Sequence, residues 1–588
     1  MKRHLYLFIL ILTALSGARA NAQDATPSPS PSPTPPVVDA QKVQPENLQG
    51  VPDIAAGYKS DDRALPDLGR VGVDMADQKP LTLSDAIALA LENNKDIEVT
   101  RKNVNIAEFE LKIARGVYEP HLTGQTYYDR STIPNTSIFS TNTTTTTGSL
   151  VQNLGLNGYV PKFGTVLSGS FGNQRVSSDN PILPLSPQFN TNFNFNLTQP
   201  LFRGRSFDQN RRNIEVAKRN LSLTDTQFRQ RTIEIIVNVQ RAYWDLTYAL
   251  RNLQVQRDGV RDAKMQLDHN KRLVDEGQLA PIDVIAAETQ VANFEQAVYD
   301  ALNTVTLAEN NLKNLVSPNR NHEIWAESVM PVDSVSLDVP TTTLTDALAL
   351  ALQNRPELEV NDVQKDINRI DQRFYKELTK PQIDFTASYT TAGIGGSQNP
   401  SFSNPFARTA CDDPASPECL AVLAQQQTFL RTIGGAGTTY TDIFANKYPT
   451  FRVGVTFNLP LFGDKTSHAQ LGKSMVEGER LQTQREQIEQ NIQVEVRNAL
   501  QTLRTAEARL RAAAIARENS VKQYESEQRK LDAGQSDVYK VLERQTALTN
   551  ARSSELRAQT ELNKAIADLQ RATGNSLKAN NIEARLKR

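Results

Sequence analysis

The chain has 588 residues, with 65 lysines and arginines against 66 acidic residues and a formal net charge of −1. This near-neutral charge argues against a general nucleic-acid binder, which needs a basic surface. Two cysteines and five histidines leave little room for a metal centre or a disulfide scaffold.

The first residues predict export. Lys2 and Arg3 precede an apolar run at 5–15, and two Ala-x-Ala sites follow within residues 18–22. This pattern is typical of a secretory signal peptide, residues 1–22. A membrane anchor is the weaker alternative, because the run is far shorter than the ~20 residues of a spanning helix. Since no later segment is long and apolar enough to span as a helix, we expect strands to make any membrane span.

Residues 23–80 form the next predicted segment. Its first part, residues 23–45, is rich in proline and serine, a composition that favours an extended, disordered tether. The remainder, residues 46–80, has a mixed composition with no clear pattern.

The rest of the chain contains an internal duplication. Residues 83–94 and 344–355 are identical at eight of twelve positions, and the same offset aligns Pro120 with Pro381. Two further landmarks recur in the same order. Pro-Leu-Phe occurs at 200–202 and 460–462, and Gly-Gln at 277–278 and 534–535. Four landmarks in register indicate two copies of a unit of about 230 residues. We place repeat 1 at 81–317, an equatorial linker at 318–340, repeat 2 at 341–575 and a C-terminal tail at 576–588.

Both repeats follow one predicted order of elements. Each opens with a capping-box pattern, Thr82-x-x-Asp85 or Thr343-x-x-Asp346, ahead of short helices. A strand, a long polar stretch, a second strand, a very long helix, a Gly-Gln turn and a returning helix follow. We expect the polar stretches, residues 133–188 and 391–449, to be external loops. Residues 162–172 hint at an extra hairpin whose place the sequence does not fix.

The predicted strands alternate between apolar and polar residues. One face of the strand that ends at Pro200 carries Phe189, Thr191, Phe193, Phe195 and Leu197, and the other carries four asparagines. Segments of this kind are typical of a transmembrane barrel with a wet interior, although any single one also fits a half-buried soluble sheet. Two strand pairs are too few to close such a barrel, which needs ~8 strands or more. The wall would therefore be shared between chains, and the sequence alone does not choose among two, three or four copies.

The helices carry heptad patterns. Residues 211–276 would span ~100 Å as one helix, whereas 282–316 and 95–118 would span ~52 Å and ~36 Å. The two shorter helices stacked end to end nearly match the long one, so each repeat is expected to give one long and one composite strut. Apolar residues at a 3.5-residue period indicate coiled-coil contacts rather than an ordinary bundle. The clearest series is Val284, Val291, Val298, Val305 and Leu312, interleaved with Ala287, Phe294, Ala301, Ala308 and Leu315.

The layout resembles the TolC-type outer-membrane efflux proteins, the outer membrane factors, from about Leu81 to Gly574. The paired Leu-x-x-Ala openings, the Pro-Leu-Phe strand ends and the tip segments at 276–284 and 533–542 carry the resemblance. It implies an α+β membrane protein that forms a homotrimer. A twelve-strand β-barrel in outer-membrane lipid would continue into a twelve-helix periplasmic tunnel. The implied partners are a periplasmic adaptor protein and an inner-membrane pump of the RND, ABC or MFS type.

The resemblance also implies a gate at the helical tips. In the family, acidic side chains there face the lumen, and by position the corresponding residues are Asp283, Lys540 and Glu543. Lys540 occupies a position where the family often has an acidic residue. Our hypothesis is therefore a ring of mixed charge, in which Lys540 pairs with Asp283 or Glu543. Solvated tip residues are the alternative. The adaptor is expected to touch the tips, including Gly277 and Gly534, where the turn should need a positive φ.

Two cysteines lie in the second predicted loop. Cys411 and Cys419 are expected to form a local disulfide in an oxidising compartment, with two free thiols as the alternative. The histidines show no ligand spacing for a metal, and no nucleophile–base grouping is legible. We therefore predict no enzyme, no metal and no cofactor.

Two functions fit these observations. The favoured one is the outer-membrane exit duct of a tripartite efflux or type I secretion system. The alternative is a periplasmic coiled-coil adaptor or scaffold, which normally offers one helical hairpin where this chain has two. The substrate is not readable from the sequence.

Overall fold

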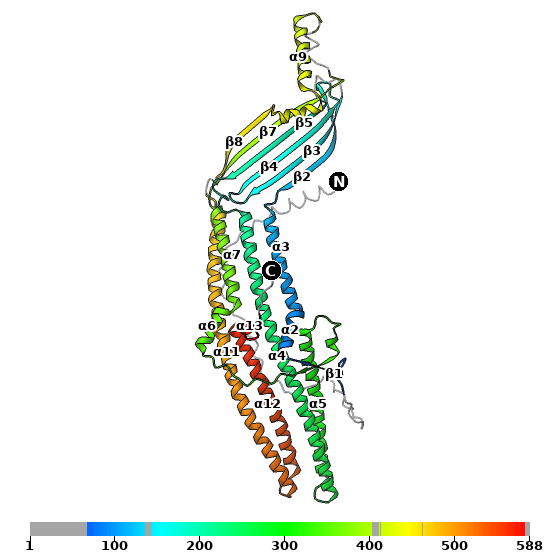
Figure 1. Ribbon diagram of the computed structural model, residues 1–588, viewed down its shortest axis with the longest axis vertical. Coiled ribbons are helices and arrows are strands. Elements are labelled where there is room, and N and C mark those ends of the chain that lie inside the picture. Colours follow the sequence, from blue (N-terminus) through cyan, green and yellow to red (C-terminus); the bar gives the residue numbers. More distant parts are fainter. Residues whose placement is uncertain (1–67, 136–142, 403–410, 412, 461–462, 583–588) are drawn as a thin grey trace, which may run out of the picture. The chain divides into compact units, whose positions relative to one another are not determined.

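The computed structural model describes residues 68–135, 143–402, 411, 413–460 and 463–582. The predicted signal peptide, residues 1–22, lies outside the described residues, as do the predicted tether, residues 23–45, and residues 583–588. The chain divides into two units, Met1–Leu68 and Gly69–Arg588. The helices and strands that the structure describes belong to the second (Figure 1).

Both repeats open with two consecutive helices. Their bounds are α2 (Leu83–Asn93) and α3 (Lys95–Gly116) in the first repeat, and α6 (Leu344–Asn354) and α7 (Pro356–Leu378) in the second. The hydroxyls of Thr82 and Thr343 accept hydrogen bonds from the backbone N–H groups of Asp85 and Asp346 at 3.0 and 3.2 Å. Such an N-cap satisfies a donor that the first helical turn leaves without a partner. The same local chemistry starts both repeats, which confirms the two-repeat pattern.

Six strands form one antiparallel sheet in the order β2-β3-β4-β5-β7-β8 (Figure 1). Their bounds are β2 (His121–Pro134), β3 (Thr144–Val160), β4 (Thr165–Ser178), β5 (Leu185–Pro200), β7 (Gln382–Gln398) and β8 (Pro449–Asn458). The prediction of one strand pair in the first repeat was wrong, because β3 and β4 form a further hairpin inside the predicted loop 133–188. The predicted twelve-strand barrel needs four strands from each of three copies. The six strands of this sheet therefore contradict that count as well.

The two faces of the sheet differ in polarity, as the alternation predicted. One row of directly paired residues runs through Leu122, Leu156, Gly169, Phe195, Tyr389 and Phe451. The adjacent row runs through His121, Asn157, Ser168, Asn196, Ser388 and Arg452. We call the side of the first row the apolar face and the side of the second the polar face. Large side chains of the apolar face stay exposed in the chain, including Val453 at 69% and Phe457 at 69%.

The connection between β7 and β8 contains two helices, α9 (Pro417–Ile433) and α10 (Ala436–Phe444). The prediction of a plain loop at 391–449 was therefore wrong, and β7 itself continues to Gln398. Helix α10 packs on the far end of the apolar face. A Cβ at Gly393 would lie 2.1 Å from the carbonyl oxygen of Thr439, so this approach requires glycine. Cys411 and Cys419 are joined in the predicted disulfide, which ties the start of α9 to the preceding chain.

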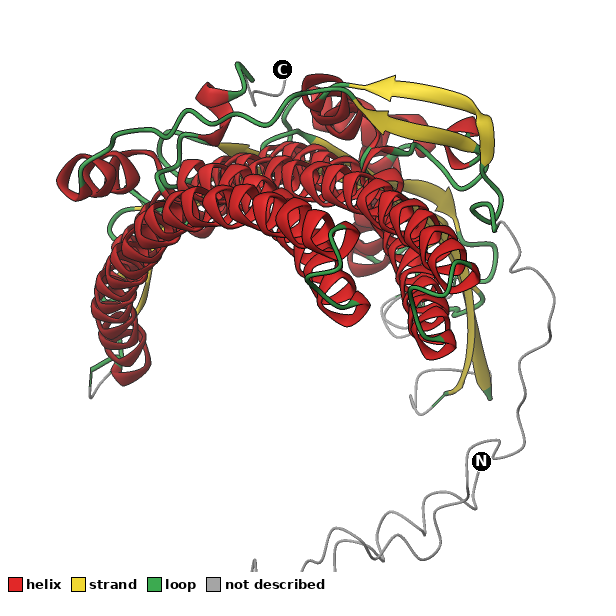
Figure 2. Cartoon of the chain, turned by 90° about the horizontal axis from the view of Figure 1, so that it is seen from below, coloured by secondary structure: helices red, strands yellow, loops and turns green. Residues whose placement is uncertain are grey.

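Long helices continue from the sheet. Helices α4 (Gln209–Asp275) and α11 (Lys465–Asp532) have 67 and 68 residues, or ~100 Å. Two shorter helices return, α5 (Pro281–Val316) and α12 (Val538–Ala572). Near the sheet the contacts place the helices in the order α3-α4-α7-α11, and beyond the equator in the order α5-α4-α12-α11. Figure 2 shows them side by side in one curved layer. This arrangement matches the expected pairs of long and composite struts.

The predicted heptad residues are buried over most of these helices. Ala287, Val291, Phe294 and Val305 of α5 lie in the core, as do the corresponding leucines of α12. Towards the end of α4 the buried set changes to Ala263, Gln266 and Asn270, two of which are polar. Among the described residues, no helix is both long and apolar enough to cross a membrane.

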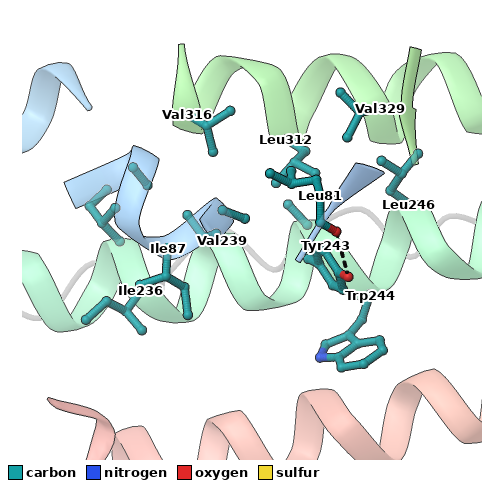
Figure 3. Close-up of a cluster of buried hydrophobic side chains, with 14 of the residues drawn as sticks. Leu81, Ile87, Ile236, Val239, Tyr243, Trp244, Leu246, Leu312, Val316 and Val329 are labelled. Carbon is teal, nitrogen blue, oxygen red and sulfur yellow. Dashed lines mark hydrogen bonds between the residues drawn. The ribbon is translucent and has the colours of Figure 1, made fainter. Parts of the chain in front are cut away.

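The largest hydrophobic cluster lies where the first repeat meets the linker (Figure 3). Strand β1 (Asp74–Leu81) pairs in parallel with β6 (Glu327–Pro331), which follows the short helix η1 (Glu323–Trp325). The buried phenol of Tyr243 donates to the carbonyl oxygen of Leu81 at 3.1 Å and to the carboxylate of Asp333 at 2.8 Å. Residues 74–80, whose composition gave no clear pattern in the sequence, are therefore held in the folded unit as part of β1.

A buried ionic cluster lies beside this core. The Arg70 guanidinium donates to the Glu309 carboxylate at 2.7 Å and also to the Ser328 hydroxyl. The Lys313 ammonium lies 3.3 Å from the same carboxylate and donates to the carbonyl oxygen of Glu327 at 2.7 Å. Exposure of the Arg70, Glu309 and Lys313 side chains is 3%, 1% and 0%. Burial lowers the pKa of Lys313, and the adjacent Glu309 opposes that shift.

Candidate functional site at the helical tips

Two short turns connect the long helices to the returning ones. We call residues 276–280 the first tip and residues 533–537 the second tip. The N–H of Gly277 donates to the carbonyl of Val274 at 2.9 Å, and the N–H of Gly534 donates to that of Leu531 at the same distance. Their φ values are +74° and +68°, the left-handed region that the sequence analysis expected. A Cβ at either glycine would meet no atom within 4 Å, so glycine is favoured here by backbone conformation and not by crowding.

A different acidic residue accepts a backbone hydrogen bond at the start of the returning helix in each tip. In the first tip the Asp283 carboxylate accepts from the backbone N–H of Ala280 at 3.2 Å. In the second tip Asp537 is the N-cap, and its carboxylate accepts from the backbone N–H of Lys540 at 2.9 Å. The Lys540 ammonium lies 3.0 Å from the same carboxylate. These contacts hold the pKa of Asp537 below its usual value and raise the pKa of Lys540.

The tips of the two repeats contact each other. Leu279 and Ala286 of the first hairpin pack against a buried cluster of the second, Leu531, Val538, Val541 and Leu542. Above it, the imidazole of His269 lies 3.3 Å from the Asp532 carboxylate. Burial raises the pKa of the neighbouring Tyr524 phenol. The hairpins therefore meet through an apolar contact that charged and polar groups surround.

The structure places the predicted gate residues on both sides of this contact. Lys540 and Glu543 are exposed on the first turns of α12, and Asp283 is half-exposed on α5. Lys540 was expected to pair with Asp283 or Glu543, and within this chain its ammonium pairs with Asp537 instead. The Asp-x-x-Lys spacing at the start of a helix is the sequence signal that would have identified this partner. Among the described residues, no group of three or more His, Cys, Asp and Glu side chains could hold a metal ion.

Similarity to known structures extends over most of the chain. The chain matches the CmeC outer membrane channel of Campylobacter jejuni with a TM-score of 0.57 and 16% identity, covering 84% of this chain and 86% of that one. It matches a membrane protein from Pseudomonas aeruginosa with a TM-score of 0.59 and 16% identity, covering 88% and 96%. It matches the open state of the Neisseria gonorrhoeae MtrE outer membrane channel with a TM-score of 0.55 and 16% identity, covering 84% of this chain and 89% of that one. At these identities the likeness shows the fold.

Sequence comparison identifies the family. No curated protein matched the chain. The family model described as outer membrane efflux protein matches residues 157–317 and 347–575, which together are more than half of the chain. The two matched segments lie in different repeats, and each includes a long helix, a tip and a returning helix. The chain therefore belongs to the outer membrane efflux protein family, a family of channel proteins.

Proposed function

We propose that this protein is the outer-membrane exit duct of a tripartite efflux or type I secretion system. In this proposal a homotrimer passes substrates from an inner-membrane pump through the periplasm to the exterior. One observation carries it: a sheet with an exposed apolar face continues directly into a layer of ~100 Å helices. Such helices are long enough to extend far beyond any bilayer, whose hydrocarbon core is about 30 Å thick. The energy for transport comes from the partner pump.

The proposed membrane segment is the sheet, with its apolar face against lipid. The exposed part of that face runs along β8 from Phe457 to Phe451, seven residues or about 20 Å of strand. Beyond it α10 covers the face, and the exposed aromatic residues Tyr440 and Phe444 lie on this helix. Aromatic residues are enriched at membrane–water interfaces, so they would mark the outer boundary of the apolar band. We assign residues 1–22 as the signal peptide that directs export.

Replacing Val455 by arginine tests the lipid contact. Val455 is 55% exposed on the apolar face, and a lipid-facing arginine near the midplane costs about 2–4 kcal/mol. We expect Val455→Arg to deplete the protein from outer-membrane fractions and to abolish its heat-modifiable oligomer. The matched control is Thr456→Arg on the next residue, which lies on the polar face and should insert normally. Equal insertion of both variants would contradict the assignment, and a soluble periplasmic pool of the natural protein would favour the adaptor or scaffold alternative.

The proposed gate and partner site is the pair of tips. We infer that Asp283, Lys540 and Glu543 line the narrow end of the duct, and that the adaptor binds there, with Gly277 and Gly534 in the contact. The apolar cluster that joins the tips is small, and exposed ion pairs contribute little to stability. The repeat boundaries given above, 81–317 and 341–575, then divide each copy into two hairpins that an adaptor can move against each other.

Removing charge at the tips should change ion flow. We expect Lys540→Ala to increase cation selectivity in single-channel recordings, and Glu543→Ala to reduce it, each by less than about fivefold because exposed charges act weakly. The matched control is Lys522→Ala, which removes an exposed cation on α11 whose pair is Glu518 at 2.7 Å. Unchanged conductance and selectivity in both tip variants would count against the gate.

The cap of the second tip predicts a pH window. The folded pKa of Asp537 is depressed, so its contribution is present above the unfolded value of about 3.9 and is lost as the pH falls through the folded pKa. The folded pKa of Lys540 is raised, so its contribution is present below about 10.4 and is lost as the pH rises through the folded pKa. The Asp537–Lys540 ion pair at the start of α12 should therefore stay intact between about pH 5 and 9. A titration of conductance across that range checks this directly.

A further inference from the structure

The extra hairpin changes how copies of the chain can meet. The sheet has two edges, β2 and β8, and each carries a row of backbone groups without a strand partner in the described part of the chain. All pairs in the sheet are antiparallel and the number of strands is even, so β2 leads away from the helices and β8 returns to them. A second copy placed beside the first therefore presents its β2 antiparallel to β8.

The width of the sheet fits the width of the helix layer. Strands lie ~4.8 Å apart, and at a tilt of ~40° six of them cover about 38 Å of circumference. Neighbouring helices pack 8–10 Å apart, so the four-helix row α3-α4-α7-α11 covers about 32–40 Å. Six strands per copy thus match four helices per copy, and the agreement holds for any number of copies.

The register inside the sheet predicts the register between copies. The row that starts at His121 in β2 ends at Arg452 in β8. His121 is five residues after the end of α3, and Arg452 is thirteen residues before the start of α11. Counted from the helix ends, the row of paired residues therefore rises by eight residues across five strand pairs, or about 1.6 residues per pair. A sixth step of the same size reaches 14 to 15 residues after α3, beside residues 130–131 of the next copy.

Side chains of opposite charge lie near this position. On the polar face the nearest β2 residue is Ser131, which would lie opposite Arg452, and Asp129 would lie diagonal to it. Both Asp129 and Arg452 are exposed, and within the described residues neither has an ion-pair or side-chain hydrogen-bond partner. A direct or diagonal cross-strand pair lies within reach of these long side chains. The neighbouring copy would supply the missing partner for each.

We propose that β2 of one copy and β8 of the next form an antiparallel strand pair in which Asp129 lies against Arg452, so that each copy contributes six strands to a shared wall. Three copies would then build eighteen strands. This inference rests on the proposed outer-membrane duct, and it goes beyond it by naming the contact and the number of strands.

Cysteine pairs test the contact in the full-length protein in outer-membrane vesicles. The described cysteines are both in the disulfide, so introduced thiols react alone. We expect Asp129→Cys/Arg452→Cys, treated with a short thiol cross-linker, to give a ladder on denaturing gels that ends at the copy number. Tyr128→Cys/Arg452→Cys is the matched control, because Tyr128 lies on the opposite face, and it should link at least several-fold less.

Charge reversal is an independent measurement. Asp129→Arg should reduce the heat-resistant oligomer several-fold, and Asp129→Arg/Arg452→Asp should restore it. An oligomer that persists in the outer membrane without edge cross-links, or a link that closes within one chain, overturns the six-strand contact and leaves the duct proposal intact. A monomer that is absent from the outer membrane overturns both.

Discussion

Glu309→Ala is expected to destabilise the fold by about 3–5 kcal/mol, the usual cost of removing one partner from a buried ion pair. The substitution leaves the Arg70 guanidinium and the Lys313 ammonium buried without their shared carboxylate. It also removes the acceptor that holds the backbone N–H of Val329 at 2.9 Å. Thermal unfolding of the helical circular dichroism signal in detergent measures the loss.

The matched control is Glu98→Ala on α3. Its partner Lys95 lies at 2.8 Å, but both side chains are about half-exposed, and exposed pairs contribute little. A second readout is proteolysis at 70–81, since Arg70 ties this segment to α5 and β6. If Glu309→Ala and Glu98→Ala unfold at the same temperature, the buried cluster does not anchor the N-terminal segment.

Leu312→Ala is expected to cost about 2–5 kcal/mol, because Leu312 is fully buried in the cluster of Figure 3 and the truncation leaves a cavity. Leu307→Ala on the same helix removes the same atoms from a side chain that is 63% exposed. It should leave the unfolding temperature of the chain nearly unchanged. Equal losses for both would place Leu307 in a contact between copies, which cross-linking of the oligomer would reveal, or would show that Leu312 is not a core residue.

Sequence patterns predicted the parts of the fold that repeat a local rule. The caps at Thr82 and Thr343, the turns at Gly277 and Gly534 and the heptads of α5 each depend on chemistry within a few residues. The alternation of β5 and β8 was equally legible because large apolar residues stand at every second position. The match to the outer membrane efflux protein family and the fold shared with the solved channels agree with these predicted elements.

Residues 162–172 indicated an extra hairpin, which β3 and β4 confirm, but the bounds and place of its strands were not predictable in the same way. Strands β3 and β4 contain glycines at 148, 155, 158, 169 and 172, together with serines and asparagines, so the apolar alternation is weak. Their strand structure depends on pairing with β2 and β5, the strands that precede and follow them in the chain. The ion pair between Lys540 and Asp537 is local, since the two residues are three positions apart, whereas the predicted ring paired Lys540 with Asp283 or Glu543.

The buried ionic cluster also escaped the sequence analysis. Arg70 comes from one place in the chain and Glu309 and Lys313 from another, where they sit among polar residues typical of a solvated helix face. Glu309 and Lys313 are four residues apart on α5, a spacing typical of surface pairs. Their burial follows from the parallel pairing of β1 with β6, which covers that side of α5.

The turn between β3 and β4 has a mechanical consequence for the molecule. Strand β2 continues from α3 after four residues, and β5 continues into α4 after eight, yet β3 and β4 end at residues 161–164 with no helix attached. That turn is fastened to the end of β5, where the side-chain amide of Gln199 donates to the carbonyl of Phe163 at 3.0 Å. A twist that travels along α3 and α4 enters the sheet at strands three spacings apart. The hairpin between them is attached to neither helix, and it keeps the two points of attachment about 14 Å apart.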